Sequence, residues 1–118
     1  MSHTVTIKLA DREIDYLLDS ALGGSGIWYW ANDSMIVRKS HSDGLEPPVD
    51  VQSEALTRGY NLRIREADNK TWHVLTLRKM LKGIGMALEA GELDISNHDG
   101  PQADLVVQYA LFGEVVYG

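Results

Sequence analysis

The segment that spans residues 60–91 constrains the fold more than any other part of the sequence. Two stretches of alternating polar and apolar residues, 60–66 and 71–76, flank the turn sequence ADNK, a pattern that predicts a β-hairpin. With Asp68 and Asn69 at the tip, the predicted register sets three pairs of residues opposite each other: Glu66 and Thr71, Arg65 and Trp72, Ile64 and His73. Side chains alternate between the two faces of a strand, so this register decides what each hairpin face carries.

The two faces predicted for the hairpin differ in chemistry. One face combines two cations with an aromatic ring and a valine: Arg63, Arg65, Trp72 and Val74. The other face is largely apolar and is expected to point into the core: Leu62, Ile64, His73 and Leu75. On this second face, His73 is interpreted as a core imidazole whose nitrogens are hydrogen-bonded.

A helix is predicted directly after the hairpin, from an N-cap at Thr76 to about Ala90, with Gly91 as its stop. Its core stripe is expected to consist of Leu77, Leu81, Ile84 and Leu88. Its first two turns carry three basic residues that lie off the stripe: Arg78, Lys79 and Lys82. This placement opposes the helix macrodipole, which favours negative charge at a helix start, and a bound anion would compensate it.

The whole pattern predicts an α+β fold, as a single domain over residues 1–118 with a mainly antiparallel sheet and about three helices. The helices are expected near 11–22, 77–90 and 101–112. Further strands are expected at 4–9, 26–30, 35–39 and, at the end of the chain, 115–118. The buried candidates of the last helix are Leu105, Ala110 and Leu111.

Local signals mark where these elements begin and end. Asp11 is the predicted N-cap of the first helix, and the glycine pair 23–24 is its predicted left-handed stop. Asn32 and Asp33 indicate a turn. Residues 40–54 contain one glycine and a proline pair, so they are predicted to form a long exposed loop.

Composition excludes several classes of protein. The chain has 118 residues, of which 44% are hydrophobic, which is enough for one packed domain. It has no cysteine, so disulfides, thiolate metal sites and cysteine nucleophiles are excluded. No apolar run approaches the roughly 20 residues of a membrane-spanning helix, and the N-terminus lacks a signal-peptide pattern. A cytoplasmic protein with no membrane partner is therefore expected.

The charges of the chain are segregated along the sequence. The formal net charge is -6, which disfavours binding to long nucleic acids. Residues 58–82 nevertheless carry seven basic and two acidic side chains, whereas residues 83–118 carry six acidic side chains and no Lys or Arg. The basic block is interpreted as an anion-binding surface, with a set of ordinary solvated faces as the alternative.

The stretch GGSG at 23–26 precedes two tryptophans that are two residues apart. The exposed backbone amides of Gly24, Ser25 and Gly26 are candidates for a phosphate cradle. On a strand, Trp28 and Trp30 would share one face and stack on a base. The alternative is a glycine helix cap followed by an aromatic core strand. The stretch is not a Walker loop, because no Gly-Lys-Ser or Gly-Lys-Thr follows it.

The candidate site is therefore one that binds a ligand without catalysis. Its residues supply backbone amides, stacking rings and cations: Gly24, Ser25, Gly26, Trp28, Trp30, Arg63, Arg65, Trp72, Arg78, Lys79 and Lys82. Arginine pairs with phosphate and tryptophan stacks on a base, although arginine also lies over tryptophan on ordinary exposed faces. Ligand spacings for a metal and a serine nucleophile elbow are both lacking, so no metal, cofactor or catalytic residue is predicted.

Three short stretches have distinctive sequences: the ending QYALFGEVVYG (108–118), the aromatic GGSGIWYW (23–30) and the segment WHVLTLRKMLKGI (72–84). Together they resemble a set of small, mostly uncharacterised proteins that phages and mobile elements of bacteria encode. The resemblance implies a genomic context and assigns no catalytic residue. Small phage proteins of this kind often disarm host defences by sequestering nucleotide signals, by blocking a host protein or by imitating DNA.

The main functional hypothesis is a phage-type anti-defence protein that sequesters a small phosphorylated nucleotide, the immune signal of the host. The first alternative is an inhibitor that binds a host defence protein directly, or a small structural accessory protein. The second is an enzyme that degrades the nucleotide signal. A DNA mimic needs a dense acidic surface, which the basic block opposes. A homo-oligomer is considered as well, because a ligand pocket is often assembled at an interface between copies.

Overall fold

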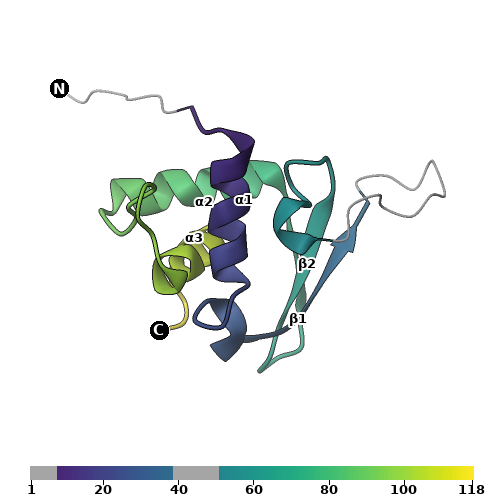
Figure 1. Cartoon of the computed structure of the whole chain (residues 1–118). Helices are drawn as coiled ribbons and strands as arrows, with labels where there is room; N and C mark the ends of the chain where they lie inside the picture. The colour runs from purple at the N-terminus through teal and green to yellow at the C-terminus, as the bar shows by residue number, and fades with distance from the viewer. Residues whose placement is uncertain (1–7, 39–50) are drawn as a thin grey trace.

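A computed structural model describes residues 8–38 and 51–118 of the chain (Figure 1). Its helices are α1 (Asp11–Ala21), α2 (Leu77–Glu89) and α3 (Gly100–Phe112), and its strands are β1 (Ala31–Val37), β2 (Asn61–Glu66) and β3 (Trp72–Leu75). Two single-turn 3-10 helices, η1 (Ile27–Tyr29) and η2 (Gln52–Glu54), precede and follow β1. Three helices and one antiparallel sheet in these ranges confirm the predicted α+β class.

The sheet has the strand order β1-β2-β3, with β2 in the middle. β2 and β3 form the predicted hairpin in the predicted register, with Arg65 opposite Trp72 and Ile64 opposite His73. Burial alternates along β2, where Leu62 and Ile64 are fully buried. The hairpin therefore has one core face and one outer face, as its sequence pattern predicts.

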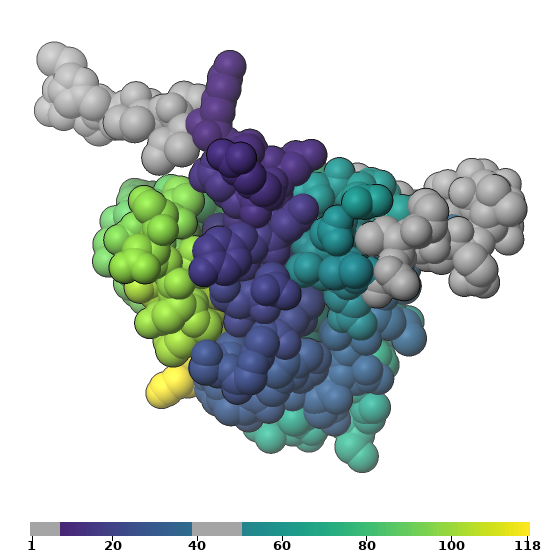
Figure 2. All heavy atoms as spheres, in the orientation of Figure 1, coloured from purple at the N-terminus to yellow at the C-terminus, as the bar shows by residue number. Residues whose placement is uncertain are grey.

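The three helices pack together on the core side of the sheet (Figure 1). In the space-filling view, α1 lies between the C-terminal third of the chain and the segment that follows residue 51 (Figure 2). α2 and α3 approach each other closely at Gly83. A Cβ at this position would overlap the Val106 carbonyl oxygen and lie 2.9 Å from Ala110 Cβ. The largest fully buried side chains come from all layers: Leu17, Leu18, Ile27, Leu56, Leu62, Ile64, Leu75, Met80, Val106, Val107 and Gln108.

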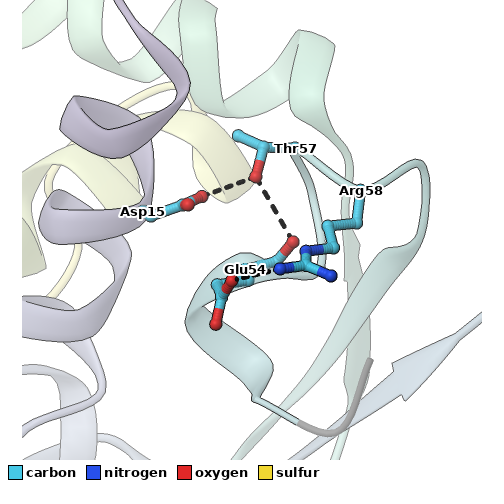
Figure 3. Close-up of polar contacts among 4 residues, drawn as sticks. All are labelled: Asp15, Glu54, Thr57 and Arg58. Carbon is cyan, nitrogen blue, oxygen red and sulfur yellow. Dashed lines mark hydrogen bonds and ion pairs between the residues drawn. The ribbon is translucent and has the colours of Figure 1, made fainter. Parts of the chain in front are cut away.

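Polar contacts tie α1 to the segment that contains η2 (Figure 3). Thr57 Oγ1 donates to Asp15 Oδ1 at 2.6 Å and lies 3.3 Å from the Glu54 carbonyl oxygen. Arg58 Nη2 pairs with Glu54 Oε1 at 2.9 Å. The hydrogen bond to Asp15 holds the chain before β2 against α1, and the two contacts of Glu54 lie within the η2 segment. None of them involves a predicted site residue.

Side-chain caps fix the starts of α2 and α3. Thr76 Oγ1 accepts from the Lys79 N–H at 3.1 Å, so the predicted N-cap of α2 is confirmed. The Asp99 carboxylate accepts from the Gln102 N–H at 2.9 Å at the start of α3. The stop of α2 is confirmed too, because Gly91 has a φ of 71°.

Both predicted ends of α1 are wrong in detail. The N-cap is Ala10 and not Asp11, because Glu13 Oε1 accepts from the Ala10 N–H at 3.3 Å and satisfies that donor from within the helix. The C-cap is Leu22 in a right-handed conformation, and the glycine pair 23–24 has no positive φ. The core stripe Ile14, Leu17, Leu18 and Ala21 is buried.

The aromatic stretch 26–30 is not a strand, contrary to the prediction. It forms η1, a 3-10 turn. Gly26 lies so close to α1 that a Cβ there would overlap the Ala21 carbonyl oxygen. This close approach turns the chain sharply before η1, where an extended stretch would carry it past the helix.

The first strand begins earlier than predicted. β1 starts at Ala31 and runs through Asn32 and Asp33, the expected turn, with a shift of register between Ala31 and Asp33. A β-bulge accommodates the two polar residues without ending the strand. At the other end of the chain, residues 115–118 have no regular secondary structure, so the predicted final strand is wrong.

Two predictions lie largely outside the described residues. Of the strand expected at 4–9, only residues 8 and 9 are described, and they are irregular. Of the loop expected at 40–54, residues 40–50 lie outside the described ranges, and η2 forms within the rest.

The buried side of α2 is rotated relative to the predicted stripe. Ile84 is buried as expected, but Leu81 is 44% exposed. The other buried positions of α2 are Met80, Gly83 and Ala87. The helix is turned this way because Gly83 faces α3 where the two helices come closest. In α3, Ala110 is buried as predicted, whereas the two predicted leucines, Leu105 and Leu111, are half-buried.

Candidate functional site

The hairpin face that combines arginine with tryptophan lies on the side of the sheet away from the core. We call this side the outer face and define it by Met35, Arg63, Arg65, Trp72 and Val74. The guanidinium carbon of Arg63 lies 4.6 Å from the centre of the Trp72 ring, and that of Arg65 lies 6.0 Å from it. Both distances are within the range of cation–π attraction. The structure thus brings together the three hairpin residues of the predicted site.

The two guanidinium groups have hydrogen-bond donors to offer. Within residues 8–38 and 51–118, neither Arg63 nor Arg65 forms a hydrogen bond or ion pair through its side chain, and Arg65 Nε is buried without a partner. Asp33 is opposite Arg65 in the register, but its Oδ1 accepts from the Ser34 N–H at 2.8 Å. Arg65 Nε is shielded from solvent, so an added anion would be bound by the remaining guanidinium N–H groups, which no protein acceptor in the described ranges uses.

A third cation reaches the edge of the outer face. Lys79 Nζ donates to the Val74 carbonyl oxygen at 2.8 Å, which places its ammonium group at the free edge of β3. Arg78 and Lys82 are exposed on the same helix, and in the described ranges no contact joins them to the outer face. Of the three predicted helix cations, the structure therefore brings one to the site.

Apolar side chains extend the outer face. Met35 of β1 is 40% exposed and Val74 of β3 is 39% exposed. Both lie beside Arg63, because Arg63 pairs with each of them across the sheet. The outer face is therefore a cationic and aromatic centre with an apolar flank.

The tryptophans of the 23–30 stretch do not join this site. Trp30 is only 2% exposed, and its Nε1 donates to Asp104 Oδ1 at 2.7 Å on the core side of the sheet. Trp28 is partly exposed, and its Nε1 donates to the Leu22 carbonyl oxygen at 2.8 Å. The expectation that both rings share one strand face is wrong, because η1 replaces the strand.

The glycine turn packs against the start of α3. Gly26 is buried, and its N–H donates to the Gly23 carbonyl oxygen at 3.1 Å. A Cβ at Gly100 would overlap the Ser25 hydroxyl. Gly26 therefore uses its amide inside the turn, and the stretch 24–26 lies apart from the arginines of the outer face.

A buried carboxylate lies where the sequence indicated none. Asp104 of α3 is 3% exposed. It accepts hydrogen bonds from Tyr29 Oη at 2.6 Å, from Trp30 Nε1 at 2.7 Å and from Gln108 Nε2 at 3.0 Å. Burial and the adjacent Asp104 carboxylate raise the pKa of Tyr29 to about 12. The sequence signal was a single acidic residue in a predicted helix that has no other charged side chain.

Gln108 fastens the end of the chain to α3. Its Oε1 accepts from the N–H groups of Val116 and Tyr117 at 2.9 and 2.8 Å. Its Nε2 lies 3.2 Å from the Tyr117 carbonyl oxygen. The side-chain amide thus bonds to the backbone of Val116 and Tyr117 and holds the irregular end of the chain against α3.

Tyr117 closes the core beneath the hairpin. Its ring stacks on Trp30 with centroids 5.5 Å apart and planes inclined by 2°. Its hydroxyl donates to Glu66, and this hydrogen bond, with that from His73 at 2.5 Å, holds the pKa of Glu66 below its usual range. The same hydrogen bond to Glu66 raises the pKa of Tyr117 to about 12. His73 also lies edge-on to Phe112 at 5.1 Å. Its imidazole is hydrogen-bonded as the sequence predicted, but its side chain is only partly buried, with 24% exposed.

Two of the three stretches with distinctive sequences, 23–30 and 108–118, therefore meet in space. Beside their junction lies an open groove of about 550 Å³. Its lining comes from η1, α3 and the end of the chain: Tyr29, Pro101, Asp104, Leu105, Val115, Val116, Tyr117 and Gly118. It carries no basic residue, unlike the outer face.

A second histidine is buried where the sequence indicated only a loop. His98 is 7% exposed, with Nε2 3.0 Å from Ser20 Oγ and Nδ1 3.3 Å from the Ile95 carbonyl oxygen. Tyr16 covers its ring at 4.4 Å. These contacts fasten the loop before α3 to α1.

In the part of the chain that the structure describes, there is neither a cluster of metal ligands nor a membrane-spanning helix. Among residues 8–38 and 51–118, no cluster of three His, Asp or Glu side chains is arranged to hold a metal ion. No helix in the same ranges is long and apolar enough to cross a membrane. Comparison with protein families, with curated proteins and with solved structures gives no match for this chain.

Proposed function

We propose that the protein binds a small phosphorylated nucleotide on its outer face and does not transform it. One observation carries the proposal: two guanidinium groups, which have no acceptor among the described residues, lie 4.6 and 6.0 Å from one indole ring. Phosphate oxygens would accept from Arg63 and Arg65, as charge-assisted and bidentate pairs do elsewhere in proteins. Lys79 at the edge of β3 would add a third positive charge.

The base would stack against Trp72. Arg63 already covers this ring, so the base either displaces the guanidinium or stacks above it. Both arrangements are physically reasonable, because a guanidinium is planar and stacks on aromatic rings. Met35 and Val74 would contact the sugar or the second ring of the base.

The resemblance to phage-encoded proteins favours a nucleotide immune signal of the host as the ligand. The protein would then act as a sponge that lowers the free concentration of the signal. Its net charge of -6 would repel long nucleic acids, which meet the field of the whole surface. A single nucleotide meets only the outer face.

Calorimetry tests the proposal with purified protein and a panel of cyclic dinucleotides, cyclic oligonucleotides and ADP-ribose derivatives. We expect a Kd tighter than about 10 μM, roughly -7 kcal/mol, for at least one member of the panel. The double variant Arg63→Glu/Arg65→Glu should lose that binding. The control Lys8→Glu/Arg12→Glu makes the same change of charge at exposed positions around the start of α1 and should keep it. No binding across the panel would overturn the proposal, as would equal losses in both variants.

Recovery of the ligand separates binding from cleavage. Heat denaturation after incubation should release the nucleotide intact, as mass spectrometry would show. Recovery of a cleaved product would show that the protein is an enzyme and not a sponge.

The second candidate is a surface that binds a host protein, and the exposed Met35 and Val74 favour it. Apolar residues beside arginine and tryptophan are typical of protein interfaces. If a host protein is the target, Met35→Asp should abolish activity in a phage-defence assay, and the wild-type protein should bind no member of the nucleotide panel. If the protein is a nucleotide sponge, Arg63→Glu/Arg65→Glu should instead lose nucleotide binding and activity together.

A further inference from the structure

We propose that the groove beside the end of the chain receives the outer face of a second copy of this protein, so that copies associate head to tail. The groove belongs to the helical side of the molecule, because α3 supplies Pro101, Asp104 and Leu105. The outer face lies on the opposite side of the sheet. One molecule therefore presents both surfaces at once.

The charges of the two surfaces are complementary. The groove is lined by no basic residue, and Glu114 is exposed beside the groove-lining Val115. The outer face offers Arg63 and Arg65, which have no ion pair in the described part of their own chain. Complementary charge speeds association and sets the orientation of the partners.

Both surfaces also expose apolar side chains. Around the groove, Val115 is 38% exposed, Val116 54% and Tyr29 58%. The outer face contributes Met35 and Val74, which are exposed to a similar extent. Burial of these residues in an interface would supply the free energy that charge alone does not give at physiological salt.

Two copies are not expected to associate through the edges of their sheets, because side chains block both edges. Association through the outer face and the groove is not blocked in this way. At one edge, Lys79 Nζ donates a hydrogen bond to the Val74 carbonyl oxygen of β3 at 2.8 Å. At the other, Gln52 Nε2 occupies the Ser34 carbonyl oxygen of β1 at 3.2 Å. A side chain on an edge carbonyl, with a lysine at the edge, blocks the strand pairing by which sheets of two copies would join.

An interface between two different surfaces is heterologous, and it allows a test by complementation. The face variant is Arg63→Glu/Arg65→Glu, and the groove variant is Glu114→Lys/Val116→Ser. Each variant lacks one surface and keeps the other. We expect each alone to sediment as a monomer of 13.1 kDa at low salt. An equimolar mixture should form a dimer that grows no further, because it contains one intact outer face against one intact groove.

The wild-type protein should show a mass that increases with concentration up to about 1 mM and decreases with added salt, as expected for weak electrostatic association. The control Glu89→Lys changes the charge of the exposed end of α2 and should associate like the wild type. A monomeric wild type would overturn the inference, and so would a mixture of variants that stays monomeric.

The measurement is independent of the proposed function. It contains no nucleotide, and calorimetry is done on protein dilute enough to be monomeric. Loss of self-association would therefore leave nucleotide binding standing, and the reverse is equally true. If both hold, a bound nucleotide occupies the outer face and should dissociate the copies.

Discussion

A buried carboxylate without a cation depends on hydrogen-bond donors, and Asp104 has donors from Tyr29, Trp30 and Gln108. Asp104→Asn keeps the size of the side chain but turns one acceptor into an amide group that donates. One of the three donors then faces another donor. We expect the free energy of unfolding to fall by about 1–3 kcal/mol, the usual cost of a buried polar group without its partner.

Urea denaturation followed by tryptophan fluorescence measures this loss. Asp94→Asn is the matched control, because Asp94 is exposed and caps only the Ser96 N–H in a loop. Its effect should stay within about 0.5 kcal/mol. A similar effect of both variants would contradict the importance of the buried cluster.

The hydroxyl of Tyr117 makes the stability of the fold depend on pH. Its hydrogen bond is the main reason why the pKa of Glu66 lies below its usual range. A carboxyl group with a lowered pKa stabilises the fold above the pKa of the unfolded chain, about 4.3, and this contribution disappears as the pH falls through the folded pKa. Tyr117→Phe should therefore be less stable than the wild type at pH 7.

The difference between Tyr117→Phe and the wild type should shrink as the pH falls below that of the Glu66 titration. Denaturation midpoints at a series of pH values measure it. A constant difference at all pH values would mean that the tyrosine acts through packing on Trp30 alone.

The closeness of α2 and α3 follows from one glycine. A Cβ at Gly83 would overlap the Val106 carbonyl oxygen, so Gly83→Ala must push the two helices apart. We expect a loss of about 1–3 kcal/mol in the free energy of unfolding, typical of overpacking. Gly85 lies in the same helix with nothing near a Cβ, and Gly85→Ala should stabilise the protein by up to about 1 kcal/mol through helix propensity. Thermal denaturation distinguishes the opposite signs.

The elements also show where sequence reasoning succeeds. The hairpin and its register were predictable because alternation along 60–66 and 71–76 is local, and a shift by one residue would bury arginine and expose leucine. The stretch 26–30 was misjudged because a short aromatic run fits a strand or a turn equally well. The buried side of α2 was misjudged because leucine was favoured over Gly83, whose importance depends on the helix that packs against it.

For the whole molecule, the raised pKa values of two tyrosines predict that the free energy of unfolding decreases at high pH. The pKa values of Tyr29 and Tyr117 are both raised to about 12 by the fold. A raised pKa favours the neutral form in the folded state, so the stabilisation is complete below the ordinary tyrosine value of about 10 and is lost as the pH rises towards 12.

Ultraviolet absorbance of tyrosinate, followed together with circular dichroism, tests this expectation. Tyr29 and Tyr117 should ionise only near pH 12 or as the fold is lost. The pKa of Tyr109 is raised as well, because its hydroxyl donates to Glu92. Asp104→Asn should lower the pKa of Tyr29 while leaving that of Tyr117 high, because Glu66 governs the latter. Ionisation of all five tyrosines at the ordinary pKa in the folded protein would contradict both assignments.

The sequence by itself determined the helices, the hairpin and the grouping of Arg63, Arg65 and Trp72, because caps, periodicity and strand register depend on near neighbours. Only the tertiary structure decided that Trp30 is buried against Asp104, 74 positions along the chain. A buried polar group takes its partner from whatever lies close in space, and no local pattern carries that information. The same reason explains the site. The hairpin residues form one cationic face, whereas Gly26 and Trp30 became part of the core that holds this face in place.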